Sequence, residues 1–453
     1  MNQKMKDKFS YDEIKSMIIV LAGNFLEYFD LMLFTHLSFV ITPIFLPKTD
    51  PIVTKFLTIL AFSSTFIIKP FGAYFWGMIG DKYGRVTVLT YTTLIMAGTC
   101  LVIPNIPTYA QWGFYATFLM MLCRTLQGFS STGESKCAEI YIAETLPLTS
   151  KVFLASVLIP ITCDLGGFFA SLMGSLCLSF LPQDGWKVAF YIGAVIAVCA
   201  TFARLYLTEP EEFTTSQKTF DTEETLLQRY FEKRNFMALL GMNVICPTAF
   251  YFAFSVCSDM MSDRLRMSPS SILFSNGFVM FAEIIFLYIC ARFTIKHHPF
   301  KILKIRTWTS FVLMPLSFLW MITNTSHLSI FVAQVIAIIS TASFDPAAPL
   351  VIKSFHVSNR FSQYSKAAGI TKALMYLSTG YLTHYFSEIF GVWAVLGLLM
   401  FFSGFFLISL NLFVPIDEMR KTLINLVEMN KEKTKKKLAQ KFDGIPDVLE
   451  QNI

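Results

Sequence analysis

The stretch Gly77-Met-Ile-Gly-Asp-Lys-Tyr-Gly-Arg85 decides how the rest of the chain is organised. It lies between two long apolar runs, at about residues 53–79 and 86–104, so the connection between them is only a few residues long. Two hydrophobic helices joined by so short a basic turn form a hairpin, and the turn is expected on the cytoplasmic side of a membrane.

The residues of this turn suggest specific contacts. Gly84 can adopt a backbone conformation that residues with side chains avoid, and the glycines on either side of Asp81 allow close approach of backbones. Asp81 can accept hydrogen bonds from free amides at the start of a neighbouring helix, and Arg85 can pair with a carboxylate. An ordinary basic loop that only orients the hairpin is the alternative interpretation.

The amino-acid composition indicates a protein that crosses the membrane many times. Of its 453 residues, 54% are hydrophobic and only 15% are charged, with a mean hydropathy of +0.55. A soluble protein of this size would carry about a quarter charged residues. Apolar runs of about 20 residues, the length that crosses a bilayer, recur from end to end. The first run follows a charged stretch and is too long for a cleaved signal, so it is expected to be retained.

Cysteines and net charge exclude several other classes. The nine cysteines lie in or beside apolar runs without paired metal-type spacing, so neither disulfides nor a metal or other cofactor is expected. The basic residues behind the net charge of +6 lie in loops that flank the membrane. A role in orienting the chain in the membrane explains them better than binding to nucleic acid does. The expected partners are a small-molecule substrate and membrane lipid, and a monomer is expected.

The apolar runs form two sets of six, separated by a charged stretch. We therefore predict an all-α polytopic membrane protein with twelve transmembrane helices in two six-helix halves. The expected parts are a cytoplasmic N-terminus (1–16), an N-terminal bundle (17–208), a central cytoplasmic loop (209–236), a C-terminal bundle (237–415) and a basic cytoplasmic tail (416–453). Lysine and arginine concentrate in alternate loops and at both ends, which places both termini in the cytoplasm. Substrate would then bind near the midplane, between the halves.

Two carboxylates in the first apolar run are candidates for proton coupling. Glu27 and Asp30 are three residues apart and share a helix face that must point inward, because a charge at the bilayer centre costs at least ~2.5 kcal/mol. Burial and mutual repulsion would favour protonation of at least one, as a proton carrier requires. A structural pair that is neutralised by a basic residue is the alternative.

Arg124 lies midway along another apolar run and therefore needs an acidic partner, for which Glu27, Asp30 and Glu134 are the candidates. Asp164 and Glu283 are further carboxylates inside apolar runs. Tyr28 could contact a quaternary ammonium by a cation–π interaction, although ordinary packing explains it as well. The complete set of cavity or substrate candidates is Asn24, Tyr28, Lys69, Gln127, Asp164, Glu283 and Lys372.

Several of these motifs resemble a known family. Gly77-x-x-x-Asp81-Lys82-x-Gly84-Arg85 resembles the signature loop between helices two and three of the major facilitator superfamily, with Lys82 where arginine is usual. The resemblance implies that this loop is a conformational latch and not a substrate site. The expected latch residues are Gly77, Asp81, Lys82, Gly84 and Arg85.

Further motifs resemble the metabolite:proton symporter family within that superfamily. They are Gly23-Asn24-x-x-Glu27-x-x-Asp30, Lys69-Pro70-x-Gly72-Ala73 and Arg124-x-x-Gln127-Gly128 with Gly133-Glu134. Members include proline/betaine, oxoglutarate, citrate and shikimate transporters, and the run Gln127-Gly128-Phe129-Ser130 favours the proline/betaine transporters. The resemblance implies proton-coupled import across a bacterial inner membrane, with Glu27, Asp30, Arg124 and Glu134 coupling the proton. Thr132, Lys69 and Tyr28 depart from the family pattern, so substrate identity is not carried over.

Two other functions are alternatives. Drug antiporters of the same fold usually carry Gly-Pro-x-x-Gly-Gly in helix five. This chain has Thr162-Cys163-Asp164-Leu165-Gly166-Gly167 there, which keeps the last two glycines but lacks the Gly-Pro and so counts against antiport. A membrane channel or enzyme is the third reading, but the spans show no filter-like sequence, Ser/His/Asp set or phosphate-binding glycine loop. We therefore expect a symporter and not an enzyme.

Overall fold

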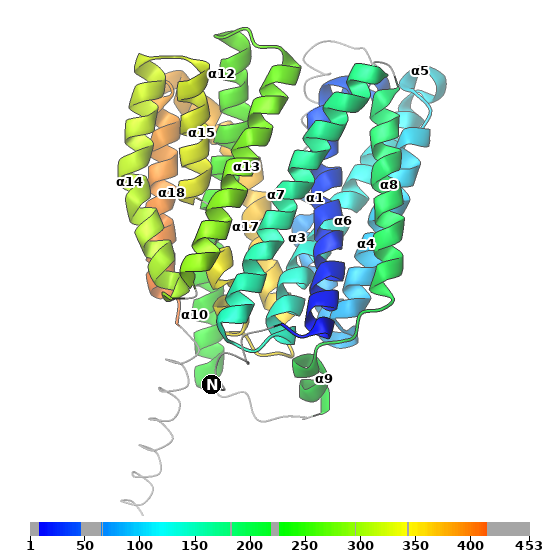
Figure 1. The fold of residues 1–453 in the computed structure, drawn as a ribbon, viewed down its shortest axis with the longest axis vertical. Helices are drawn as coiled ribbons and strands as arrows, with labels where there is room; N and C mark the ends of the chain where they lie inside the picture. The colour runs from blue at the N-terminus through cyan, green and yellow to red at the C-terminus, as the bar shows by residue number, and fades with distance from the viewer. Residues whose placement is uncertain are drawn as a thin grey trace, which may run out of the picture.

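The computed structural model of the protein describes residues 9–46, 65, 67–181, 184–218, 226–294, 296–341 and 344–414. Within these ranges the regular elements are helices, and the long ones stand side by side in a bundle (Figure 1). The N-terminal half contains α1 (Tyr11–Phe45), α3 (Lys69–Tyr83), α4 (Arg85–Val102), η1 (Ile103–Asn105), α5 (Tyr109–Trp112), α6 (Phe114–Thr145), α7 (Ser150–Phe180) and α8 (Gly185–Arg204).

The short helix α9 (Glu211–Lys218) follows the first half and precedes the second. The C-terminal half contains α10 (Leu226–Met242), α11 (Ile245–Tyr251), the π-helical turn η2 (Phe252–Val256), α12 (Cys257–Asp263), α13 (Pro269–Thr294), α14 (Pro299–Thr323), α15 (His327–Thr341), η3 (Asp345–Ala347), α16 (Ala348–Ile352), α17 (Arg360–Phe390) and α18 (Trp393–Leu412). We call the two ends of the bundle the α9 end and the α5 end, after the short helices found there (Figure 1).

The prediction of an all-α, twelve-helix membrane fold is confirmed. Segments α10–α12 and α15–α16 each form one interrupted membrane helix, so each half supplies six. Nine segments of the described chain are long and apolar enough to cross a bilayer. The other three are α3, α6 and α17; only 15 residues of α3 are described, and α6 and α17 carry more polar residues. The predicted second run, 53–79, falls largely outside the described residues.

Two helix interruptions have identifiable causes. Pro346 stands at the start of η3, where its missing amide and rigid ring break the helix between α15 and α16. The second interruption is the π-turn η2, in which the Ala253 carbonyl is free to accept a hydrogen bond of 2.6 Å from the Gln334 side chain. Both interruptions lie in the C-terminal half.

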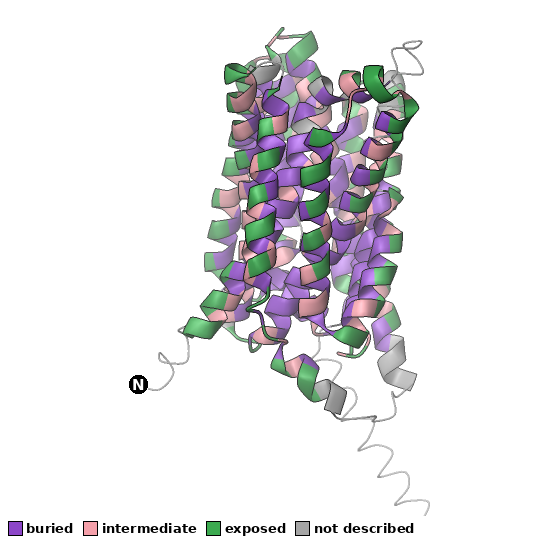
Figure 2. Ribbon diagram, turned by 90° about the vertical axis from the view of Figure 1, so that its right-hand side faces the viewer, coloured by how far each residue is buried: buried purple, intermediate pink, exposed green. Residues whose placement is uncertain are grey.

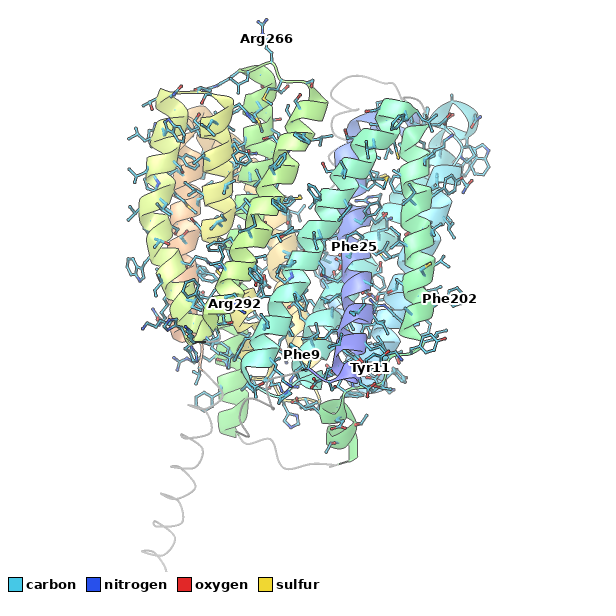
Figure 3. The ribbon with its side chains drawn as sticks, in the orientation of Figure 1. Phe9, Tyr11, Phe25, Phe202, Arg266 and Arg292 are labelled. Atoms are coloured by element: carbon cyan, nitrogen blue, oxygen red, sulfur yellow. The ribbon has the colours of Figure 1, made fainter. Side chains whose placement is uncertain are left out.

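Large apolar side chains cover the outer surface of the bundle. Phe202 on α8 is 64% exposed and points away from the bundle (Figure 3). Buried residues gather on the inward faces of the helices, whereas exposed ones alternate along the outer faces (Figure 2). In water such a surface would be unstable, so its natural surroundings are lipid tails.

The halves meet along two pairs of helices. Helix α7 packs against α13, and α3 packs against α17. A Cβ at Gly77 would lie 2.8 Å from the Ser362 Cα, and one at Gly369 would lie 2.7 Å from the Ala73 Cβ. Only glycine allows the α3 and α17 backbones to approach this closely. The candidate functional site lies between these two contacts.

Candidate functional site

A cavity of about 160 Å³ lies at the interface between the two halves. It is lined from the first half by α1, α3, α6 and α7, and from the second by α10, α11, η2, α13, α15, η3 and α17. Among the predicted candidates, the cavity walls include Tyr28, Lys69, Asp164, Glu283 and Lys372. Charged residues that the sequence analysis did not assign to the cavity also line it: Lys136, Glu139 and Asp345.

Asn24 and Gln127, two further candidates, have other roles. Asn24 is completely buried, and its side-chain amide donates to Ile159 O at 3.0 Å and to the Thr162 Oγ1 at 3.2 Å. These bonds hold α1 against α7 beside Pro160, which interrupts the α7 backbone hydrogen bonds. Gln127 accepts a hydrogen bond of 2.7 Å from the Arg124 guanidinium.

Glu27 lies next to the basic side of the cavity. One of its carboxylate oxygens accepts a hydrogen bond from the Ser131 hydroxyl, and the other has no hydrogen-bond partner among the described residues. The residue is only 2% exposed. Its favourable electrostatic interactions are with Lys69 on α3 and Lys372 on α17. The Glu27 carboxylate therefore interacts with one lysine from each half.

Asp30 has a different environment. It accepts a hydrogen bond from the Cys100 thiol at 3.1 Å and interacts electrostatically with Arg124. The Arg124 guanidinium also lies 3.8 Å from the centre of the Phe34 ring. The spacing of Glu27 and Asp30 predicted mutual repulsion, but each carboxylate faces its own basic partner instead. Helix packing separates their surroundings although they share one helix.

Glu134 does not pair with Arg124, which corrects one of the three pairings proposed from the sequence. It forms an ion pair with Arg204 of α8 and accepts hydrogen bonds from the Thr92 and Thr93 hydroxyls at 2.6 and 3.2 Å. Arg204 is completely buried. Its place at the end of an apolar run, where basic residues usually reach the membrane surface, gave no sign in the sequence of this buried pair.

Beside the cavity, an ion pair within α6 is hydrogen-bonded to a tyrosine of the other half. Lys136 Nζ donates to Glu139 at 2.6 Å, and the Tyr364 hydroxyl of α17 donates to the same carboxylate. Lys136 and Glu139 are one helical turn apart on α6, and that spacing was the signal that could have found them. Both residues line the cavity.

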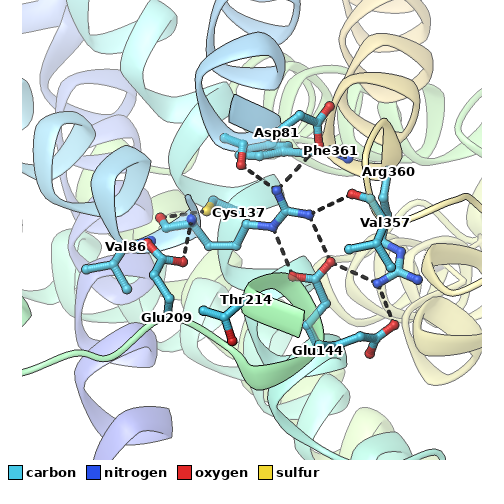
Figure 4. A network of polar contacts seen from close by, with 12 residues as sticks. Asp81, Val86, Cys137, Glu144, Glu209, Thr214, Val357, Arg360 and Phe361 are labelled. Carbon is cyan, nitrogen blue, oxygen red and sulfur yellow. Dashed lines mark hydrogen bonds and ion pairs between the residues drawn. The ribbon is translucent and has the colours of Figure 1, made fainter. Parts of the chain in front are cut away.

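At the α9 end, a polar network centred on Arg85 and Glu144 joins the halves (Figure 4). Arg85 donates to both carboxylate oxygens of Glu144 at 2.9 Å and to Val357 O at 3.2 Å. Arg360, at the start of α17, donates to Glu144 at 2.8 Å and to Glu212 of α9 at 2.9 Å. Glu144 therefore holds one arginine from each half, and bidentate arginine pairs of this kind are strong and directional.

Asp81 makes the contact that its position in the sequence suggested. Its two carboxylate oxygens accept hydrogen bonds from the backbone amides of Phe361 and Ser362, at 3.0 and 2.9 Å. These amides belong to the first turn of α17, where backbone donors lack partners within the helix.

Gly84 and Glu209 complete the start of α4. Gly84 has φ of +106°, and a Cβ there would overlap the Glu209 carboxylate. That carboxylate accepts hydrogen bonds from the backbone amides of Arg85 and Val86, at 2.8 and 2.9 Å, and so caps α4. Burial raises the pKa of Glu209. Lys82, the remaining predicted latch residue, is exposed and lies over the Tyr83 ring.

Comparison with known proteins supplies the family. Residues 20–362 match the model of the Major Facilitator Superfamily. The chain belongs to the major facilitator superfamily. This confirms the superfamily resemblance inferred from its motifs, and the apolar helices are those of a multi-pass membrane protein.

Curated relatives of this superfamily member are named proline/betaine transporters. One from Salmonella typhimurium is 32% identical over 208 residues, which cover 44% of this chain and 41% of the relative. A putative one from Staphylococcus aureus (strain COL) is 33% identical over 205 residues, which cover 44% of each chain. The chain thus matches less than half the length of these relatives. The proline/betaine-type resemblance inferred from the sequence is confirmed at this level.

Solved structures confirm the superfamily fold. The proton:xylose symporter XylE matches with a TM-score of 0.68 over 88% of this chain and 94% of that chain, at 13% identity. FucP in its outward conformation matches with a TM-score of 0.67 over 89% and 99%, at 12% identity. Identities this low support a shared fold and nothing further. No group of His, Cys, Asp or Glu side chains suited to a metal ion occurs in the described chain.

Proposed function

We propose that the protein is a proton-coupled symporter that imports a small zwitterionic or carboxylate metabolite, such as proline or betaine, by alternating access. The observation that carries the proposal is the central cavity, which lies between the halves and has basic and acidic walls. Lys69 and Lys372 provide a site for a substrate carboxylate. In transporters of this architecture, substrate binds at such an interface while the halves rock around it.

Glu27 supplies the coupling to protons in this proposal. While Glu27 is ionised, it attracts the same two lysines that would bind a substrate carboxylate. Protonation of Glu27 removes that competing negative charge, so binding of the proton raises the affinity for substrate, and binding of substrate raises the affinity for the proton. Coupling between two ligands of this kind is reciprocal. Asp30 and Arg124 form a second buried pair that could carry the proton onward, and Glu134 with Arg204 fixes α6 against α8.

The network at the α9 end is the proposed latch, as the resemblance implied for Gly77, Asp81, Lys82, Gly84 and Arg85. Its hydrogen bonds join α3, α6 and α9 to α17, and α4 to Val357 just before α17, and therefore favour a state in which the halves touch at that end. The distribution of lysine and arginine between loops orients this end, with both termini, toward the cytoplasm. We propose a bacterial inner membrane as its location, the proton as its coupling ion, no other cofactor, no nucleic-acid partner, and a monomer.

Uptake into proteoliposomes under an inward proton gradient tests the proposal. The panel contains proline, glycine betaine, oxoglutarate, citrate and shikimate, each measured with and without a protonophore. Accumulation of one compound above its external concentration, abolished by the protonophore, is the expected result. Accumulation that persists with the protonophore present would exclude proton coupling, and downhill flux only would exclude active transport.

A further inference from the structure

One wall of the central cavity carries three carboxylates that the proposed proton coupling does not use. They are Asp164 on α7, Glu283 on α13 and Asp345 in η3. Asp164 belongs to the N-terminal half, and the other two belong to the C-terminal half. The acidic wall is therefore divided between the two parts of the protein that would move relative to each other.

The three carboxylates are unequally neutralised. Arg306 interacts electrostatically with both Glu283 and Asp345. Asp345 also interacts electrostatically with Lys136 and Lys372. The electrostatic interactions of Asp164 are with Glu283 and Asp345, which are both acidic. Its Oδ2 is buried and has no hydrogen-bond partner in the part of the chain that the structure describes. An ionised carboxylate in such surroundings is costly unless a cation joins it.

We infer that Asp164 and Glu283 bind a monovalent cationic group that bridges the two halves. Its chemistry is that of Na⁺ or of a substituted ammonium. The lining aromatics Tyr28, Phe250 and Tyr376 suit the ammonium, because aromatic faces attract such cations. If the group belongs to the substrate, the inference rests on the proposed transport function. It then places the cationic end of a zwitterion at Asp164 and its carboxylate at Lys69 and Lys372.

Such a cation would also favour closure of the halves around it. Without it, carboxylates from opposite halves repel each other. With it, each half gains an attractive contact to the same group. A ligand shifts a conformational equilibrium only through a difference of this kind in its contacts with the two states.

Cation binding is measured first on the purified full chain, without any transport. Thermal unfolding is followed in NaCl, tetramethylammonium chloride or N-methylglucamine chloride at equal ionic strength. We expect one of the two smaller cations to raise the unfolding temperature, since a ligand that binds only the folded state stabilises it. Asp164→Asn and Glu283→Gln should abolish the rise, whereas Asp184→Asn, at an exposed ion pair, should preserve it. No rise in the unaltered chain, or an equal rise in the Asp164→Asn variant, would overturn the inference.

Transport then identifies the source of the cation. Proline uptake is compared with uptake of cyclopentanecarboxylate, which has the ring and carboxylate but lacks the ammonium. If the substrate supplies the cation, Asp164→Asn should raise the KM for proline roughly tenfold or more and leave cyclopentanecarboxylate unaffected. If Na⁺ supplies it, uptake of both compounds should depend on Na⁺, and the variant should lose that dependence.

The two proposals fail separately. Cation-dependent stabilisation without uptake of any panel compound would reject the transport proposal and retain the cation site. Proton-driven uptake that is unchanged in Asp164→Asn and Glu283→Gln, whether or not Na⁺ is present, would reject the cation site and retain the transporter.

Discussion

Gly23 illustrates how one missing side chain positions a buried charge. A Cβ at this position would overlap the Arg204 guanidinium and lie 2.6 Å from the Glu134 Oε1. The absence of a side chain on α1 therefore creates the space in which the Arg204–Glu134 ion pair forms. A buried pair of this kind requires good geometry, because desolvation of two charges offsets much of their attraction.

Gly23→Ala should destabilise the protein by about 1–3 kcal/mol, because the added methyl group displaces Arg204 from Glu134. Thermal unfolding in detergent measures the loss. Gly98→Ala on α4 is the matched control, since no atom lies within 4 Å of a Cβ there, and alanine favours a helix more than glycine does. Equal unfolding temperatures for Gly23→Ala and the unaltered chain would contradict the assigned packing.

At the scale of elements, the short helix α9 connects to the C-terminal half by ion pairs. Glu212 of this short helix pairs with Arg360 at 2.9 Å and with Lys353 at 3.1 Å, both in the C-terminal half. Burial opposes ionisation of Glu212, but Arg360 and Lys353 outweigh it and lower the pKa of Glu212 below its usual value of 4.5. The Phe213 ring, one residue on, lies 4.4 Å from the Arg85 guanidinium. The segment after the first half is thus part of the proposed latch.

This geometry predicts an acid-sensitive latch. Because closure lowers the pKa of Glu212, its contribution is complete above pH 4.5 and is lost as pH falls through the lowered pKa. The α9 end should therefore open more readily in acid, below that lowered pKa, than at neutral pH. Spin-label distances between Lys82→Cys and Ser358→Cys, with exposed Cys199 replaced, would measure the opening.

The Glu212→Gln variant separates this group from other carboxylates of the latch, Asp81 and Glu144. It should weaken closure at neutral pH and reduce the change in distance between neutral and acid conditions. An unchanged acid response in Glu212→Gln would assign the pH dependence to those other carboxylates instead.

At the scale of the whole molecule, polar groups from both halves meet at two places. The network at the α9 end joins the halves, and charged residues of both halves line the central cavity. A movement of one half against the other would therefore change both places together. This arrangement is what alternating access requires.

Replacing both Glu27 by Gln and Asp30 by Asn should abolish proton-driven accumulation while downhill exchange of substrate continues. The physical reason is that the cavity lysines remain in place to bind substrate, but neither proposed coupling carboxylate can change its charge during the cycle. Accumulation and exchange in proteoliposomes measure the two activities side by side, with Asp184→Asn as the control. Full accumulation in the double variant would contradict the coupling assignment.

The sequence determined the helices, their number and the latch motif. Apolar runs must form helices in a bilayer because backbone groups have no other hydrogen-bond partners there, and this requirement is local. The contact of Asp81 with a helix start was likewise foreseeable from a short turn with free carboxylate oxygens. Only the tertiary structure decided which charges meet, because pairing depends on how each helix is rotated and packed against others. That is why Arg204 rather than Arg124 pairs with Glu134, and why Asp164, Glu283 and Asp345, far apart in sequence, share one wall of the cavity.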